Sequence, residues 1–273
     1  YQATSRGILL EKIRPQMGIW RIEEEKLYPQ SVEECTGLAA GLGLDEETYS
    51  ALTFYHRLGS HLPQCTVVGT RDAQGRPLIG KTDDIGHEDL GMNILETTRP
   101  DHGYAHRHFH FAGTLWTIAG INECGLSIGM TGIPGPLRDK GLFSLTALHT
   151  ILPACANVEE AIVHIRALQL NAYGFSLMLG DAQGHLTLIE KTSAGMVVLD
   201  PENIPLAHTN HILDHPPRSQ PRLTAFRPSG VLSDHTRPSG SVMSGMASKC
   251  SSIAASSASS TSSAETMPAK SFG

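Results

Sequence analysis

The order of hydrophobic and polar positions along the chain predicts alternating blocks of helices and strands. Residues 1–62 have a helical pattern, with few β-branched runs. Ser31 followed three places later by Glu34 is a capping-box spacing and predicts the start of a helix. Gly41 ends that helix, and a second one is expected to begin at Asp45. The chain therefore opens with a helical segment.

The pattern changes to strands at Cys65. A β-branched run, a polar turn and a second apolar run predict a β-hairpin over residues 65–84. The tetrapeptide Asp-Ala-Gln-Gly forms the turn at 72–75, and it occurs again at 181–184 between two further expected strands. We interpret this recurrence as matched turn chemistry, because nothing else repeats around it.

Further hairpins and helices are expected in the rest of the chain. A second hairpin is predicted over residues 111–132, and a helix over residues 141–152 that Pro153 closes. Asn157 begins another helix, with Glu160 at the capping-box position. The order of helices, strands, helices and strands predicts an α+β fold of layered antiparallel sheets with helices packed outside, or αββα.

Composition narrows the class of protein. The chain has 273 residues and a formal net charge of −6 without a basic block, so we expect no nucleic-acid partner. Its five cysteines form no CxxC pair, which argues against a disulfide framework and fits a reducing, cytoplasmic compartment. No apolar run has membrane-spanning length, so no membrane partner is expected.

The composition also suggests domain boundaries. We expect a helical leader over 1–64, a catalytic domain over 65–226, and a serine-rich, disordered or aberrant tail over 227–273. The chain begins with Tyr1 and ends in this serine-rich stretch, so we expect that it lacks core elements at its C-terminus.

Cys65 is the first candidate for chemistry. A lone cysteine before a β-branched run is most often a small buried hydrophobic residue. However, Asp83 and Asp84 end the partner strand of the same hairpin, which would place a carboxylate near Cys65. The pattern thus leaves both a structural and a catalytic interpretation open.

Two histidine-containing segments provide further candidates. His106, His108 and His110 alternate, so on a strand they would share one face and form a metal patch or simply a polar face. No nearby acidic residue or fourth histidine completes a metal set at a recognised spacing. Asn210, in the segment AHTNH, offers an amide donor for an oxyanion hole, although an asparagine there can also serve a turn.

Several segments together resemble a known family. EECTGLAAGLGLDEETYSALTFYH, CTVVGTRDAQGRPLIGKTDD, GINECGLSIGMTG, GFSLMLGDAQGHLTLIEKT and HTNH occur in the order and at the approximate spacing of the isopenicillin N acyltransferase-like family. This family belongs to the N-terminal nucleophile (Ntn) hydrolases and is distantly related to penicillin V acylase and bile salt hydrolase. The resemblance covers about residues 30–225 and implies a four-layer αββα fold without a cofactor.

The resemblance also implies roles for individual residues. Cys65 would be the nucleophile and would cut the chain after Gln64. Asp84 matches the aspartate that holds the new α-amine, with Asp83 as the fallback. Asn210 matches an asparagine that donates to the oxyanion.

The remaining positions match the family pattern less closely. Arg222 resembles a late arginine near the nucleophile. Lys81 stands where related enzymes carry an arginine, and Thr131 where they often carry a second asparagine. Gln64 replaces the usual glycine before the nucleophile, and this departure is expected to slow or alter self-cleavage.

The expected function is that of a self-cleaving cysteine Ntn amidohydrolase or acyltransferase. Its partners would be a small acyl-amide substrate, an acyl-CoA donor, and the small and large subunits made by its own cleavage. Two alternatives stay open at this point: a metal-dependent hydrolase built on His106, His108 and His110, and an inactive, truncated member of the family.

Overall fold

The chain divides into two units, Tyr1–Ala225 and Phe226–Gly273. The computed structural model describes the following parts of the first unit: residues 3–58, 64–84, 91–199 and 206–213. The serine-rich tail, whose disorder was predicted, lies outside the described residues.

The N-terminal segment is helical, as predicted. Its three helices are α1 (Ala3–Leu27), α2 (Pro29–Gly41) and α3 (Glu46–Leu58). Asp45 precedes α3 and its Oδ1 accepts a hydrogen bond from the Thr48 amide at 2.8 Å, which is the expected N-cap. None of the helices within the described residues is both long and apolar enough to cross a membrane.

The predicted start of α2 is wrong by two residues. The helix begins at Pro29, and its N-cap residue Tyr28 makes no side-chain cap. Proline is favoured at the first helical position because its φ is already helical and it has no N–H to satisfy. Ser31 therefore lies inside the helix, where its hydroxyl donates to the Tyr28 carbonyl at 2.8 Å.

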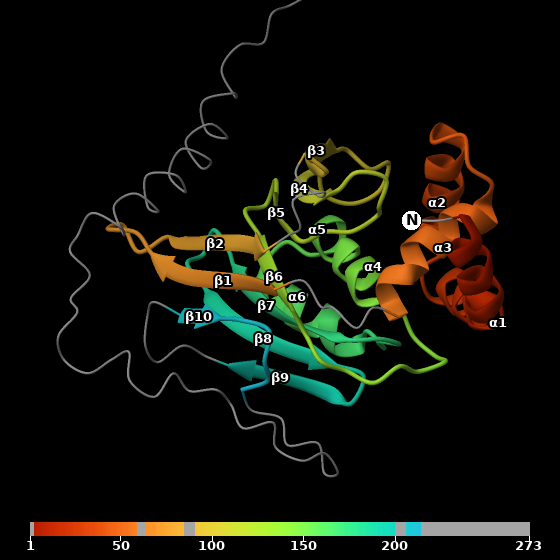
Figure 1. Ribbon diagram of the computed structural model, residues 1–273. Coiled ribbons are helices and arrows are strands. Elements are labelled where there is room, and N and C mark those ends of the chain that lie inside the picture. The colour runs from red at the N-terminus through yellow and green to blue at the C-terminus, as the bar shows by residue number, and fades with distance from the viewer. Residues whose placement is uncertain (1–2, 59–63, 85–90, 200–205, 214–273) are drawn as a thin grey trace, which may run out of the picture. The chain divides into compact units, whose positions relative to one another are not determined.

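The strands form two antiparallel sheets (Figure 1). The smaller sheet has the order β10-β1-β2, with strands β10 (Leu206–His208), β1 (Gln64–Arg71) and β2 (Pro77–Asp84). The larger sheet runs in sequence order from β3 to β9: β3 (Asn93–Thr98), β4 (His106–Phe111), β5 (Ala119–Asn122), β6 (Ser127–Ile133), β7 (Gly174–Gly180), β8 (Leu186–Thr192) and β9 (Gly195–Leu199). Both predicted hairpins are present, as β1–β2 and β5–β6.

The two Asp-Ala-Gln-Gly turns have the same hydrogen bonds. Oδ1 of Asp72 accepts from the amides two and four residues later, and Oδ1 of Asp181 does the same. Gly75 and Gly184 both adopt positive φ, 79° and 93°, which only glycine reaches without strain. The interpretation as matched turn chemistry is confirmed.

Three helices lie between β6 and β7 in the chain: α4 (Ser144–His149), α5 (Ile151–Ala154) and α6 (Val158–Ala167). The helix predicted over 141–152 is thus two short helices, separated at Thr150, and Pro153 lies inside the second. A proline in the first turn of a short helix leaves no amide unsatisfied, so it does not have to end the helix. Asn157 and Glu160 form the predicted cap of α6.

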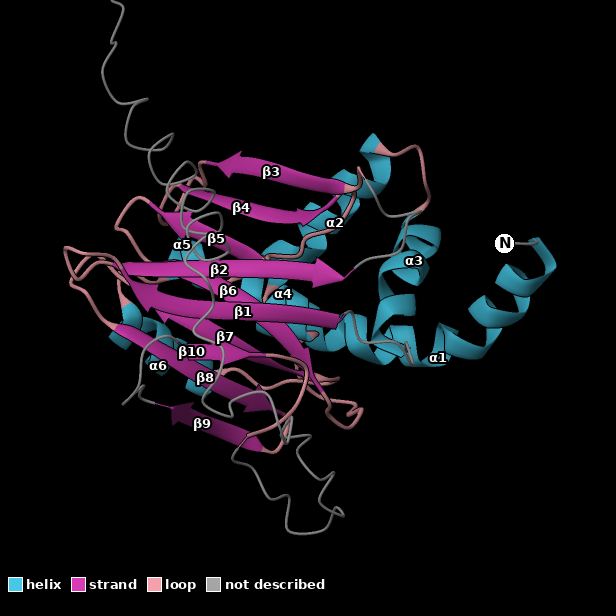
Figure 2. Ribbon diagram, turned by 60° about the vertical axis from the view of Figure 1, so that its left-hand side comes forward, coloured by secondary structure: helices cyan, strands magenta, loops and turns pink. Residues whose placement is uncertain are grey.

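The main hydrophobic core lies between the larger sheet and α4–α6. It includes fully buried side chains from the sheet, such as Phe175 and Leu177, and from the helices, such as Leu148 and Ile165. A smaller cluster around Val67 and three other buried residues joins the two sheets. Figure 2 shows β1 and β2 in front of the larger sheet and the helices behind it.

The fold is therefore the expected mixed α+β architecture of two layered sheets, with helices packed on the larger one. The described residues form three of the four αββα layers, namely α4–α6, the larger sheet and the smaller sheet. Within them no helix layer covers the outer face of β1 and β2 (Figure 2).

Candidate active site

The β1–β2 hairpin positions Cys65. Alternation along β1 turns Cys65 and Val67 toward the larger sheet, and Cys65 is only 4% exposed. Cys65 pairs directly with Asp83, so their side chains share a face. The thiol donates to Oδ1 of Asp83 at 3.2 Å, and the buried ammonium of Lys81 forms an ion pair with the same carboxylate oxygen.

Asp84 is placed differently from Asp83. It pairs with Gln64 and is exposed, so its side chain points away from the Cys65 thiol. The resemblance matched Asp84 to the aspartate that holds the α-amine, with Asp83 as the fallback. In the structure Asp83, and not Asp84, contacts the Cys65 thiol.

Asn210 connects the nucleophile candidate to the larger sheet. Its Oδ1 accepts a hydrogen bond from the Cys65 amide at 2.6 Å, and its Nδ2 donates to the Gly132 carbonyl at 2.7 Å. The amide orientation follows from these partners, because the Cys65 N–H needs an acceptor and the Gly132 oxygen needs a donor. Asn210 also forms a side-chain hydrogen bond with the Cys65 thiol, which lowers the pKa of the thiol, so this side chain contacts both the nitrogen and the sulfur of Cys65.

A buried histidine–glutamate pair supports the segment that carries Asn210. Nε2 of His208 lies 2.8 Å from Oε1 of Glu190, and both side chains are fully buried. Oε1 also accepts from the Leu213 amide at 2.7 Å, so Glu190 ties both sides of Asn210 to β8. Thr131 contributes on the same face, since its hydroxyl donates to the Thr209 carbonyl at 3.1 Å.

Sequence reasoning missed His208 and Glu190 as site residues. The available signal was a glutamate inside the otherwise apolar strand LTLIEKT, because a buried carboxylate requires a partner. Its partner could not be identified from one sequence. Arg222, the predicted late arginine, lies outside the described residues.

Burial controls the protonation of the cysteine. Loss of solvent raises the pKa of the Cys65 thiol to about 11, and the Asp83 carboxylate adds to the rise. Lys81 acts in the opposite direction, but burial dominates. In the uncut chain Cys65 is therefore a neutral thiol whose proton is directed at Asp83.

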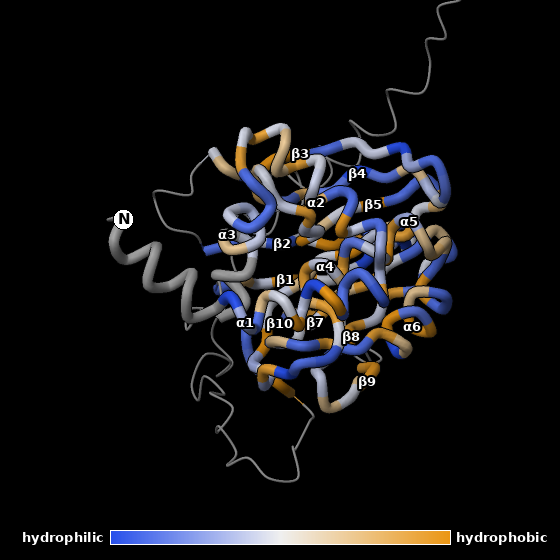
Figure 3. Tube along the Cα trace, turned by 90° about the vertical axis from the view of Figure 1, so that its right-hand side faces the viewer, coloured by the Kyte–Doolittle hydropathy of each residue, from blue (hydrophilic) through white to orange (hydrophobic). Residues whose placement is uncertain are grey.

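The three predicted histidines share one face of β4, as expected, but that face is buried. In Figure 3 the hydrophilic colour of β4 contrasts with the apolar colour of α5. Within the described residues, His108 and His110 have ring nitrogens close to a third ligand group, which is the carboxylate of Glu96 on β3. The expectation that no acidic residue completes this set is wrong, because the acid comes from the neighbouring strand, and His106 is not part of the group.

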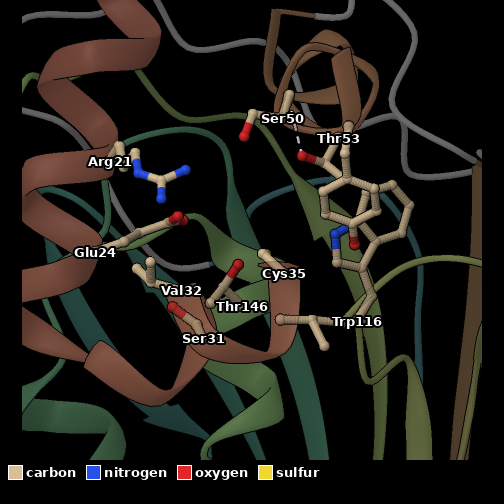
Figure 4. Close-up of a pocket in the computed structure, with 11 residues that line it drawn as sticks. Arg21, Glu24, Ser31, Val32, Cys35, Ser50, Thr53, Trp116 and Thr146 are labelled. Atoms are coloured by element: carbon tan, nitrogen blue, oxygen red, sulfur yellow. Dashed lines mark hydrogen bonds between the residues drawn. The ribbon is translucent and has the colours of Figure 1, made fainter. Parts of the chain in front are cut away.

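Two cavities lie away from Cys65. One of about 30 Å³ opens between the N-terminal helices, the β4–β5 loop and α4 (Figure 4). It is lined by Arg21, Glu24, Ser31, Val32, Cys35, Tyr49, Ser50, Thr53, Leu115, Trp116 and Thr146. Another, of about 320 Å³, adjoins the end of α6 and the β8–β9 turn. Cys65 lines neither of them.

Comparison with known proteins agrees with the sequence resemblance. Residues 70–230, more than half of the chain, match the family described as acyl-coenzyme A:6-aminopenicillanic acid acyl-transferase. No curated protein gives a significant match. The resemblance found in the sequence is thereby confirmed at the level of the family.

Three of the solved structures that resemble this chain match it over about half of its length. Conjugated bile acid hydrolase from Clostridium perfringens is 16% identical with a TM-score of 0.43, over 55% of this chain and 54% of that one. The N-acylethanolamine-hydrolyzing acid amidase ortholog of Caenorhabditis elegans is 14% identical with a TM-score of 0.42, over 55% and 71%. Penicillin V acylase from Agrobacterium tumefaciens is 18% identical with a TM-score of 0.36, over 54% and 50%. The chain spans about half the length of the first and third of these proteins.

Proposed function

Since the chain belongs to the acyl-coenzyme A:6-aminopenicillanic acid acyl-transferase family, we propose that it is a cysteine Ntn enzyme that hydrolyses or transfers an amide-linked acyl group through a thioester on Cys65. The main support for this proposal is that two hydrogen bonds, one from the thiol and one from the backbone amide, hold Cys65 in place. Asp83 accepts from the Cys65 thiol, and Asn210 accepts from the Cys65 amide.

The first reaction in this proposal is self-cleavage. Asp83 takes the thiol proton and the Cys65 sulfur attacks the Gln64 carbonyl carbon. The C–N bond to Cys65 then breaks, the proton goes to the leaving nitrogen, and the acyl group now sits on sulfur as a thioester. Water hydrolyses the thioester, which returns the thiol and leaves a carboxylate on Gln64 and a free α-amine on Cys65.

The second reaction uses the new N-terminus. An α-amine has a reference pKa near ~8, so it can take the proton of its own thiol at neutral pH. The sulfur attacks the acyl carbon of a small amide or an acyl-CoA, and the leaving amine or thiol receives the proton. Water then completes a hydrolysis, or a second amine completes a transfer.

Asp83 and Asn210 act on different sides of Cys65 in this scheme. Asp83, held by Lys81, anchors the thiol side of Cys65. Asn210 holds its nitrogen through Oδ1, and it is held in turn by Gly132 and by the Glu190–His208 pair. Preorganised groups of this kind lower the barrier because they need no rearrangement during the reaction.

The segment 1–64 would stay bound after cleavage as a small subunit, with 65–226 as the catalytic part. The indole of Trp20 on α1 is fully buried and donates to the Arg138 carbonyl at 2.9 Å. Glu34 on α2 contacts His149 on α4 at 3.2 Å. Burial of a large aromatic side chain contributes about 1.5–3 kcal/mol, and several such contacts would hold the two pieces together.

The decisive experiment is intact-mass analysis of the purified chain and its Cys65→Ala variant. The proposal expects a fragment that begins at Cys65 in the parent chain, copurifying with residues 1–64, and only full-length chain in the variant. Cys124→Ala, on the β5–β6 turn, is the matched control and should cut normally. A folded parent chain that stays full-length would favour the inactive-member alternative, and cleavage that persists in Cys65→Ala would refute the nucleophile.

A further inference from the structure

We propose that Glu96, His108 and His110 bind a divalent first-row transition ion, with Zn²⁺ as the best-fitting one. The three residues lie on β3 and β4, on the face of the larger sheet that α4 and α5 cover. Their ligand atoms all lie within 4.8 Å of one another. This site is independent of the function proposed above.

Strand pairing builds the cluster. Glu96 pairs directly with His108, and His110 is the next residue on the same face of β4. The rings of His108 and His110 stack with centroids 4.9 Å apart. Both histidines are buried, to 2% and 5% exposure, whereas the Glu96 side chain is 49% exposed and can adjust to a ligand.

The hydrogen bonds of His110 leave one nitrogen with a lone pair. Nδ1 faces two backbone carbonyls, of Phe111 at 3.1 Å and Thr114 at 3.0 Å, so it must carry the proton. In the neutral ring Nε2 is then an acceptor; it lies 3.1 Å from Oε2 of Glu96 and makes no hydrogen bond of acceptable geometry within the described residues. Two acceptors at this distance repel unless a proton or a metal ion lies between them or beside them, and the proposal assigns that place to a metal ion.

His108 directs a second nitrogen at the same place. Its Nδ1 lies 3.1 Å from the Thr117 hydroxyl, and its Nε2 lies 4.0 Å from Oε1 of Glu96. The Thr98 hydroxyl lies 3.5 Å from the same Nε2 and donates its proton to Oε1 of Glu96 at 2.9 Å, so it does not donate to His108. A ring whose Nδ1–H donates to the Thr117 hydroxyl presents the lone pair of Nε2, as a metal ligand must.

The donor set determines the class of ion. Two imidazole nitrogens and one carboxylate oxygen favour zinc and its neighbours over magnesium or calcium, which prefer oxygen ligands. Zinc holds such ligands at about 2.0–2.2 Å, and the exposed Glu96 can move to close the set while water takes the fourth position. Thr117 and the carbonyls that bind Nδ1 fix both rings, as outer partners do in metal sites.

A chain of contacts extends from this site to the N-terminal helices. The Thr117 hydroxyl also lies 3.1 Å from Nδ1 of His149, whose Nε2 contacts Glu34 on α2 at 3.2 Å. The ion would thus stabilise the edge strand β3 and the position of the His149 ring, which contacts Glu34 on α2. This site lies on the face of the larger sheet opposite Cys65.

The test is calorimetric titration of the full chain with Zn²⁺ after treatment with a chelator and removal of any affinity tag. We expect one ion per chain and a zinc-dependent rise in melting temperature. Glu96→Gln and His110→Asn should weaken binding by more than ~100-fold, since loss of an outer partner alone costs 10–100-fold. His102→Ala, an exposed histidine just before β4, and Cys65→Ala should bind like the parent chain.

The melting temperature without zinc separates a lost ligand from a damaged fold. The Glu96→Gln amide can donate to Nε2 of His110, so the zinc-free variant should melt no lower than the zinc-free parent. Failure of the parent to bind Zn²⁺, or equal binding by Glu96→Gln and His110→Asn, would overturn the proposal. A fall in the zinc-free melting temperature of Glu96→Gln would also overturn it, because it would mean that a proton on His110, and not an ion, satisfies Glu96.

Discussion

The two faces of the larger sheet each carry a histidine–glutamate pair, and the pairs are built differently. Between the sheets, His208 and Glu190 are both fully buried and lie 2.8 Å apart. On the helix side, His110 lies 3.1 Å from Glu96, whose side chain is half-exposed. The first pair has additional partners in Thr131 and Leu213, whereas the second leaves acceptor atoms facing each other.

This difference indicates different uses for the same two residue types. A buried pair with its hydrogen bonds made fixes the backbone around it, and here that backbone carries Asn210 to Cys65. The half-exposed pair lacks such partners for Nε2 of His110, and it is where we place a metal ion. Burial favours neutral forms on both faces, since it raises the pKa of Cys65 to about 11 and lowers that of His108 to about 4.

The largest expected effect concerns the two neighbouring aspartates on the inter-sheet side. Asp83→Asn should slow self-cleavage by about 10²–10⁴-fold, because it removes the group that accepts the Cys65 proton. Asp84→Asn is the matched control and should cut within a few-fold of the parent, because its side chain points away from the thiol. Time courses of fragment formation measure both rates. A larger loss in Asp84→Asn would show that the match made from the sequence was the right one.

The next effect concerns stability and would sharpen the contrast between the two pairs. His208→Leu leaves the Glu190 carboxylate buried without its partner and should destabilise the fold by about 3–5 kcal/mol. The double variant His208→Leu/Glu190→Leu should recover much of this loss, because it removes both polar groups together. Urea denaturation measures the free energies of unfolding. Equal destabilisation in the single and double variants would mean that packing, and not pairing, is what His208 contributes.

The sequence predicted local features well and cross-strand features poorly. The Asp72 and Asp181 turns and the Asn157 cap depend on residues within four positions, so their chemistry is readable from one sequence. The β1–β2 hairpin was also predictable. Its register determines whether Asp83 or Asp84 pairs with Cys65, and the two possibilities differ by one residue. A shift of one residue reverses the face of every side chain, which is why spacing alone could not make that choice.

Longer-range partners were not predictable in the same way. Glu96 was missed beside His108 and His110 because the two strands are separated by a loop whose length does not reveal the register. Glu190 was missed for the same reason, since its contact with His208 crosses between two sheets. The burial of the histidine face of β4 was also missed, because the alternating histidines suggested a metal patch or a polar face.

The smallest of the predicted effects is a shift in the pH dependence of alkylation at Cys65 in uncut chain. The thiol pKa is raised from 9.0 to about 11, so the thiolate is scarcer than in an ordinary cysteine at every pH below that range. The rate of reaction with iodoacetamide should therefore keep rising with pH toward about 11, where an exposed cysteine would level off near 9. Lys81→Met should slow the reaction at a given pH, because Lys81 lowers this pKa, and Asp83→Asn should speed it, because Asp83 raises it. Mass spectrometry of the labelled peptide gives the rates. A plateau near pH 9, or the same direction of change in both variants, would show that the inter-sheet face is more open to water than the 4% exposure of Cys65 implies.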